Sequence, residues 1–200
     1  MNIVAIGAHP DDIEIGCGGA IAKHVSQGDT VTFIIMTDGS SGGVSSEVRE
    51  SEARNAAKIL NVKEVHLLGY KDASLPGDKS VIDQVEKIIL LASPDRVYIP
   101  YHHEIHQDHR TTSAVALSAC RNVRQILMYE GPSTMSDFHV NYWINIEGHT
   151  EKKAESIRAH ASQGEKEILK IDAILGMNTF RGYQARSTFA EGFVISRFLE

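Results

Sequence analysis

The sequence has little cysteine and no excess of basic residues, and both features narrow the possible functions. Its two cysteines, Cys17 and Cys120, lie far apart and belong to no Cys-x-x-Cys pair. They are typical of buried free thiols in a reducing compartment. Asp and Glu number 26 against 20 Lys and Arg, which gives a net charge of −6. Because the basic residues are scattered singly, we do not expect nucleic acid as a partner.

Long hydrophobic runs are also missing. No apolar segment approaches the roughly 20 residues of a membrane-spanning helix, so we expect no membrane association. After Met1 the chain enters an apolar segment without the basic start and cleavage site of a secretory signal, which predicts a cytoplasmic location. Its 200 residues, 42% of them apolar, suffice for one well-buried domain and are too few for two. We therefore expect residues 1–200 to form one domain with one site.

Short β-branched runs alternate with segments of helical period. This pattern predicts βαβ units, and hence an α/β fold with a mostly parallel sheet covered on both faces. The predicted strands are 3–7, 31–36, 65–68 and 97–101, with further strand-like runs at 126–129, 142–146 and 192–198. The predicted helices are 13–26, 46–60, 81–92, 111–121, 151–162 and 165–175. The polar stretch 38–46 is a long loop in a chain of tight turns, and such loops are often functional.

A histidine and two aspartates follow the first predicted strand, in the segment A-H-P-D-D-I-E at residues 8–14. Open α/β sheets bind ligands at the carboxyl ends of their strands. His9 and Asp12 are three residues apart, and Pro10 sets the turn into the next helix, so both side chains can face one point with Asp11 beside them. Taken alone, the segment is also compatible with an ordinary turn.

A second cluster, H-H-E-I-H-Q-D-H at residues 102–109, follows the fourth predicted strand. In the strand order 3-2-1-4-5 the first and fourth strands are neighbours, so the two clusters would meet. Hydrolytic zinc sites use three N or O ligands and leave a fourth position to water. His9, Asp12 and His109 would supply such a set for Zn²⁺, and ferrous iron would suit it as well.

The remaining polar residues of the two clusters are predicted to act around this metal. Asp11 is the carboxylate free to act as the general base toward a metal-activated water. His106, held in one tautomer or kept protonated by Asp108, would stabilise an oxyanion or donate a proton to a leaving amine. His102 and His103 are expected at the rim rather than among the ligands. Glu14 is expected to bind backbone donors at the helix start rather than to serve as a second base.

With three further motifs, the sequence resembles the LmbE-like, or PIG-L, deacetylases over nearly its whole length. These motifs are R-E-S-E-A at 49–53, H-A-S-Q at 160–163 and A-E-G-F at 190–193. The resemblance implies a Rossmann-like three-layer sandwich and zinc-dependent removal of an acetyl group from a small N-acetylglucosamine-type amino sugar or its conjugate. It also implies a homo-oligomer.

The same resemblance assigns roles to individual residues. It implies zinc ligation by His9, Asp12 and His109, with Asp11 as base and Asp108 with His106 as a charge pair. It places Arg49 near the acyl or hydroxyl groups of the substrate, although Arg49 could equally pair with Glu52 on a helix face. It gives His160 a structural role or a supporting position behind the ligands. Some members carry a tyrosine where this chain has Phe189, so a tyrosine contribution would come from elsewhere, such as Tyr183, or be missing.

Two other classes of function remain open. A dinucleotide-binding oxidoreductase is suggested by Gly16, Gly18 and Gly19, but these come a helical turn too late and the acidic turn before them would repel a pyrophosphate. Close packing of the helix on the sheet explains them better. A metal- or sugar-binding module would use the same ligands without turnover, but it would have no need of a base such as Asp11.

Overall fold

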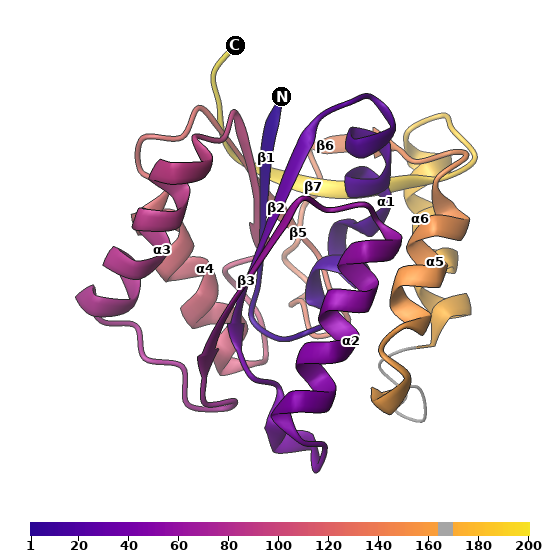
Figure 1. Cartoon of the computed structure of the whole chain (residues 1–200). Coiled ribbons are helices and arrows are strands. Elements are labelled where there is room, and N and C mark those ends of the chain that lie inside the picture. Colours follow the sequence, from indigo (N-terminus) through magenta and orange to yellow (C-terminus); the bar gives the residue numbers. More distant parts are fainter. Residues whose placement is uncertain (164–169) are drawn as a thin grey trace.

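A seven-stranded sheet in the order β3-β2-β1-β4-β5-β7-β6 forms the middle layer of the computed structural model, which describes residues 1–163 and 170–200 (Figure 1). The strands are β1 (Asn2–Gly7), β2 (Thr30–Thr37), β3 (Glu64–Tyr70), β4 (Arg96–Pro100), β5 (Gln125–Tyr129), β6 (Tyr142–Asn145) and β7 (Ala190–Phe198). The first five are parallel to one another, and β7 runs antiparallel to both β5 and β6. The predicted mostly parallel sheet is confirmed, as is the order 3-2-1-4-5.

Within residues 1–163 and 170–200, six helices cover the two faces of this sheet. They are α1 (Asp12–Ser26), α2 (Ser46–Ile59), α3 (Lys79–Ala92), α4 (Gln107–Ala119), α5 (Thr150–Arg158) and α6 (Ile171–Gln184), with short 3-10 turns at Ser40–Gly42 and Ala161–Gln163. Helices α3 and α4 lie on one face, and α1, α2, α5 and α6 lie on the other (Figure 1). Two apolar clusters fill the space between the helices and the sheet, one on each face. None of the described helices is long and apolar enough to cross a membrane.

Three predicted helices differ from the structure. The helix predicted at 111–121 begins at Gln107, because the His106 side chain accepts a hydrogen bond from the Asp108 amide and caps the helix start. The helix predicted at 151–162 ends at Arg158, and a 3-10 turn follows. Of the helix predicted at 165–175, residues 165–169 lie outside the described residues, and the helix that contains 171–175 runs over Ile171–Gln184.

Helix α1 is interrupted at Cys17, where φ is −144° and ψ is 17°. The amides of Gly19 and Ala20 donate to the Glu191 carboxylate over 2.8 and 2.7 Å, so Glu191 caps the second segment of the helix. Lys153 donates to the same carboxylate over 2.6 Å and to a backbone carbonyl of the first segment over 2.7 Å. The break is therefore satisfied by a charge pair whose side chains are 0% and 1% exposed.

The glycines of α1 serve close packing, as the sequence predicts. A Cβ atom on Gly16 would lie 2.1 Å from the Tyr129 ring of β5, and one on Gly19 would lie 2.7 Å from the Ile146 side chain. Both distances are too short for any side chain. Small residues at these positions therefore bring α1, and the turn that precedes it, close to the sheet.

Replacing Lys153 with Met is expected to lower the free energy of unfolding by about 3–5 kcal/mol, because Glu191 would remain buried as an unpaired charge. Adding Glu191→Gln should restore part of the loss, since the glutamine carries no charge. Chemical denaturation of the two variants measures both effects. An unchanged midpoint in the single variant would contradict the role of this pair.

Candidate active site

The turn after β1 carries the first half of the site. Asp11 precedes α1 with φ 118° and ψ −25°, a conformation that non-glycine residues rarely adopt. The Asp12 carboxylate accepts a hydrogen bond from the His9 amide over 2.7 Å, which folds the turn back on itself. Strained backbone of this kind persists where the surrounding structure holds it, and it is concentrated at functional sites.

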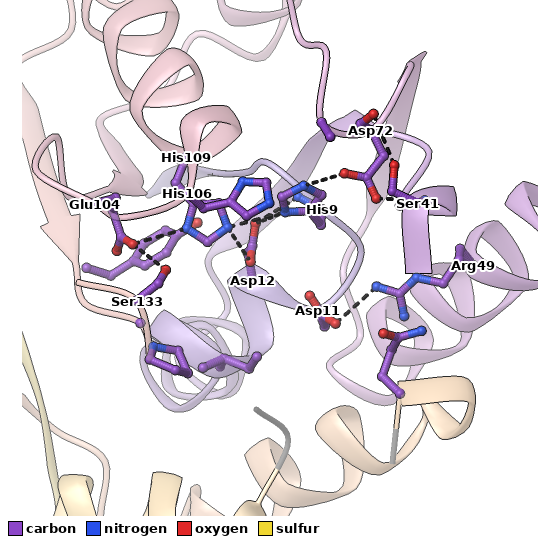
Figure 2. Close-up of a pocket in the computed structure, with 17 residues that line it drawn as sticks. His9, Asp11, Asp12, Ser41, Arg49, Asp72, Glu104, His106, His109 and Ser133 are labelled. Atoms are coloured by element: carbon purple, nitrogen blue, oxygen red, sulfur yellow. Dashed lines mark hydrogen bonds and ion pairs between the residues drawn. The ribbon is translucent and has the colours of Figure 1, made fainter. Parts of the chain in front are cut away.

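The structure brings together the three side chains that the sequence predicts as metal ligands (Figure 2). His9 Nδ1 lies 3.2 Å from His109 Nε2 and 3.5 Å from Asp12 Oδ2, and His109 Nε2 lies 3.3 Å from Asp12 Oδ1. Donors bound tetrahedrally to zinc at about 2.0–2.1 Å are separated by roughly 3.3–3.4 Å. The donor set therefore fits a divalent cation in chemistry, and each pair of residues approaches to about this spacing, with Asp12 facing His9 through Oδ2 and His109 through Oδ1.

A second layer of carboxylates surrounds these histidines. Asp72 and Asp108 lie 3.1 and 3.4 Å from His9 Nε2, and Glu104 lies 3.4 Å from His109 Nδ1. Carboxylates in such positions orient ligating imidazoles and fix their tautomers. Asp72 and Glu104 were not predicted from the sequence. Their place in the sequence was the one feature that could have indicated them. Asp72 follows β3 at the same edge of the sheet, and Glu104 lies within the second cluster.

Asp108 does not pair with His106 in the way that the sequence predicts. Its carboxylate accepts hydrogen bonds from the amides of Ala73 and Leu75 over 2.7 and 3.3 Å, and it contacts the His9 ring. The reason is the early start of α4, which places Asp108 in the first helical turn, facing the loop after β3. His106 and His9 remain in contact through their rings, whose centroids are 4.7 Å apart.

Of the two alternatives that the sequence allows for His106, a fixed tautomer or a protonated ring, the contacts favour the fixed tautomer. Its Nδ1 accepts from the Asp108 amide over 3.2 Å, so the ring proton lies on Nε2. Burial, together with the positive charge of His9 and His109, lowers the pKa of His106. Its side chain lines the pocket, where an Nε2–H group can donate to an oxygen atom of a bound molecule.

The carboxylates give the ligand cluster a strong affinity for positive charge. Burial lowers the pKa of His9, but hydrogen bonds with Asp108, Asp12 and Asp72 outweigh it and raise this pKa to about 12. Burial also lowers the pKa of His109, and its interactions with Asp12 and Glu104 raise it to about 10. The same field that holds protons on these rings would attract a metal cation.

Arg49 is buried in the pocket wall and holds the predicted base. Its Nη2 donates to Asp11 Oδ2 over 3.0 Å and to the Pro10 carbonyl, while Nη1 donates to Glu52 over 3.3 Å. Burial and the nearby Asp12 raise the pKa of Asp11, although Arg49 opposes the shift. A carboxylate with a raised pKa is a stronger proton acceptor. The contacts therefore support a positioning role for Arg49, in addition to the pairing with Glu52 that the sequence allowed.

Replacing Arg49 with Lys is expected to lower kcat about tenfold or more with a smaller change in KM, because the single ammonium of lysine cannot bind Asp11 and Pro10 while a second nitrogen is anchored by Glu52. Steady-state kinetics separate the two constants. Arg54→Lys is a matched control, since Arg54 lies on the same helix and forms an exposed pair with Glu50. A higher KM with unchanged kcat would instead make Arg49 a substrate ligand.

Glu14 does not bind backbone donors at the start of α1, contrary to the prediction. Its side chain is fully buried, neither oxygen accepts a hydrogen bond within the described residues, and Oε1 lies 3.6 Å from His160 Nε2. The turn before α1 is closed by the Asp12 carboxylate instead. Glu14 therefore points into the protein toward α5. His160 is buried beside it, in keeping with a structural role.

Three other predicted residues lie away from the site. His103 is at the exposed rim and pairs with Asp137 over 2.7 Å. Tyr183 is 81% exposed on α6 and does not line the pocket, so it supplies no tyrosine to the site. Phe189 is partly buried against the apolar cluster beneath α1.

A pocket of about 300 Å³ opens over Asp11 and the three predicted ligands. Ser41 and Gly39 from the predicted functional loop 38–46 line one side. Gly131, Pro132 and Ser133 line the other. Glu104 accepts hydrogen bonds from the hydroxyls of Ser133, over 2.5 Å, and Thr134, so it ties this second wall to His109. The walls and the ligand cluster are thus one connected structure (Figure 2).

Comparisons with known proteins agree with this geometry. The family model for GlcNAc-PI de-N-acetylase (PIG-L) matches residues 4–120. The chain is 35% identical to the uncharacterized deacetylase YaiS of Escherichia coli (strain K12) over 168 residues, which are 80% of this chain and 91% of the relative. It is 29% identical to the diacetylchitobiose deacetylase of Thermococcus kodakarensis over 194 residues, 85% of this chain and 73% of the relative. The solved structure of N,N'-diacetylchitobiose deacetylase from Pyrococcus horikoshii with an inhibitor matches with a TM-score of 0.84 and 28% identity, covering 96% of this chain and 82% of that one.

Proposed function

This chain belongs to the GlcNAc-PI de-N-acetylase (PIG-L) family, and from that premise we propose that it is a metal-dependent hydrolase of a small N-acetylated amino sugar or its conjugate. The observation that carries the proposal is the convergence of His9, Asp12 and His109 at 3.2–3.5 Å beside the buried carboxylate of Asp11. The named relatives act on amide bonds of this kind.

A divalent cation held by His9, Asp12 and His109 would polarise the acetamide carbonyl and make water more acidic. Asp11 accepts the proton of the attacking water. Its Oδ2 is bound by Arg49, which leaves Oδ1 to take the proton. The carboxylate that receives the proton then delivers it to the nitrogen of the leaving amine. Acetate and the free amino sugar are the products.

His106 stabilises the charge that develops on the carbonyl oxygen. Its Nδ1 is occupied by the Asp108 amide, so Nε2–H is the donor available to the pocket. A donor fixed in advance by the helix cap loses little freedom on binding the oxyanion. The ring transfers no proton in this scheme, which distinguishes its role from that of Asp11.

A metal- or sugar-binding module without turnover accounts less well for the site. Such a module needs the three ligands, but it does not need a carboxylate kept at a rare backbone conformation and bound by a buried arginine. The cost of that arrangement favours a catalytic Asp11.

The proposal is tested by an amine-release screen over a panel of N-acetylglucosamine conjugates, with and without a chelator. We expect release of amine from at least one conjugate and its loss on chelation. Release that persists after complete metal removal, or no release from any conjugate, would contradict the proposal. Metal analysis of protein purified anaerobically identifies the native cation and separates zinc from ferrous iron.

A further inference from the structure

The H-A-S-Q motif contributes one residue to the pocket. Gln163 ends the 3-10 turn Ala161–Gln163 and lines the pocket together with Asp11 and Arg49. Its side chain is buried, and it carries the only side-chain amide among the lining residues in the described part of the chain. An amide both donates and accepts hydrogen bonds, as the hydroxyl groups of a sugar do. The turn therefore brings to the pocket a neutral group whose chemistry matches a sugar.

A buried carboxylate, that of Glu52 on α2, holds this turn in place. Its Oε1 accepts a hydrogen bond from the Ser162 amide over 2.6 Å, and its Oε2 accepts one from the Ser162 hydroxyl over 2.7 Å. Within the turn, the backbone amide of Gln163 donates to the His160 carbonyl over 3.0 Å. Burying a carboxylate costs free energy unless hydrogen bonds offset it. Here the bonds that offset it also fix the turn against α2.

The same contacts orient the side chain of Gln163. The hydroxyl hydrogen of Ser162 is donated to Glu52, so the Ser162 oxygen can act toward Gln163 only as an acceptor. It lies 3.1 Å from Gln163 Nε2, which donates to it. The nitrogen of the amide is therefore directed at Ser162, and its oxygen is directed away from Ser162.

Glu52 also joins Gln163 to the predicted base. The Oε2 atom of Glu52 accepts a second hydrogen bond, from Arg49 Nη1 over 3.3 Å, and Arg49 Nη2 donates to Asp11 over 3.0 Å. Figure 2 shows Arg49 and Asp11 on the side of the pocket away from His109. A substrate whose acetamide reaches His109 therefore has another part of its sugar on the side to which Gln163 is tied.

We propose that Gln163 binds a hydroxyl group of the sugar ring, and that Ser162 and Glu52 are positioning residues that place its amide. The inference rests on the proposed function and deepens it, because it assigns recognition of the sugar, as distinct from the acetamide, to the H-A-S-Q turn. Asp11 with Arg49 acts on the reacting bond, and Gln163 holds the rest of the substrate. A contact made equally in the ground state and the transition state lowers KM and leaves kcat unchanged.

Replacing Gln163 with Met tests the contact, since methionine has a similar length and no amide. With metal-loaded enzyme we expect KM to rise about three- to tenfold, the effect of one lost hydrogen bond, while kcat stays within about threefold. The probe is methyl N-acetyl-α-D-glucosaminide or, where the panel holds a conjugate that is hydrolysed faster, that conjugate. Gln184→Met is the matched control, because Gln184 is exposed at the end of α6 and does not line the pocket.

Analogues of the probe identify the group that Gln163 binds. The 3-deoxy, 4-deoxy and 6-deoxy sugars each lack one ring hydroxyl or the primary hydroxyl of the parent. One of them should lose about as much kcat/KM with the native enzyme as Gln163→Met costs, and it should lose little more with the variant. Equal losses on the native and the variant enzyme for all three analogues would overturn the inference.

Replacing Ser162 with Ala tests how the amide is placed. The change removes the hydroxyl that binds both Glu52 and Gln163, and it keeps the backbone bond to Glu52. We expect a smaller rise in KM with unchanged kcat, and no further rise when Ser162→Ala is added to Gln163→Met. A lower melting temperature with unchanged KM, or rises in KM that add in the double variant, would contradict the positioning role.

The proposed function and this inference fail in different ways. Hydrolysis of no conjugate in the panel by the native enzyme would overturn both. Hydrolysis by the native enzyme with the same KM in Gln163→Met would overturn the inference alone and leave the proposed deacetylase function intact.

Discussion

Replacing Asp11 with Asn is expected to lower kcat by about 10²- to 10⁴-fold, the range that a positioned general base contributes. Asparagine has nearly the same shape, and it is among the residues that tolerate a positive φ, here 118°. It can still contact Arg49 through its amide oxygen. The change therefore removes the proton acceptor and leaves the turn in place. Single-turnover kinetics on a hydrolysed conjugate measure the effect.

Metal content is the control for the Asp11 variant. Asp11 contacts Arg49 and not the three predicted ligands, so Asp11→Asn should bind about as much metal as the native chain. Thermal unfolding in the presence of metal should be close to that of the native chain. Turnover that stays within a few-fold of native would contradict the assignment of Asp11 as base. Loss of metal together with activity would assign Asp11 to the ligand sphere.

The position of the site followed from one topological step. The strand order 3-2-1-4-5 makes β1 and β4 neighbours, and the structure pairs Val4 with Val97 in that register. Residues that follow the carboxyl ends of neighbouring parallel strands must lie together. This rule joined His9 to His109 across about one hundred residues, which no local spacing could have done.

The details of the second layer could not be predicted in this way. Whether Asp108 faces His106 or His9 depends on the residue at which α4 begins, and helix boundaries are the least certain feature of a sequence pattern. A start at Gln107 rather than at 111 turns the carboxylate toward His9. Asp72 and Glu104 lie in irregular segments, where side-chain direction is set by tertiary contacts and leaves no periodic signal. Acidic residues in the first turn of a helix commonly bind backbone amides, and Glu14 was predicted to do so. It is instead buried beside His160.

Removing a ligand is expected to abolish both metal binding and turnover. His109→Gln replaces an imidazole that faces His9 and Asp12 with an amide, which is a poor ligand for zinc. The amide can still hydrogen-bond to both neighbours, so the fold should be retained. We expect activity to fall to background and not to return with added metal. His103→Gln is the matched control, because His103 follows the same strand but pairs with Asp137 at the exposed rim.

The pH dependence of metal binding follows from the same cluster. In the metal-free protein, burial lowers the pKa of His9, but hydrogen bonds to the carboxylates outweigh it and raise this pKa to about 12. Burial also lowers the pKa of His109, and the negative charge of Asp12 outweighs it and raises this pKa to about 10. A metal must displace these protons, so its affinity should increase with pH by about tenfold per pH unit for each proton released. The rise should continue from pH 6 to about pH 10. Calorimetric titration at several pH values measures the slope.

The stability of the metal-free protein should change in the opposite direction. A histidine whose pKa is raised by folding stabilises the native state fully below its unfolded pKa of about 6.5, and that stabilisation is lost as the pH rises through the folded value. The metal-free chain should therefore lose stability between pH 7 and 10, over the range in which the metal-loaded chain binds its cation more tightly. Thermal unfolding of the metal-free and the metal-loaded chain between pH 7 and 10 tests both expected changes in stability. Parallel curves for the two forms would mean that protons and metal do not compete for the same nitrogens, and that the cation binds elsewhere than at His9 and His109.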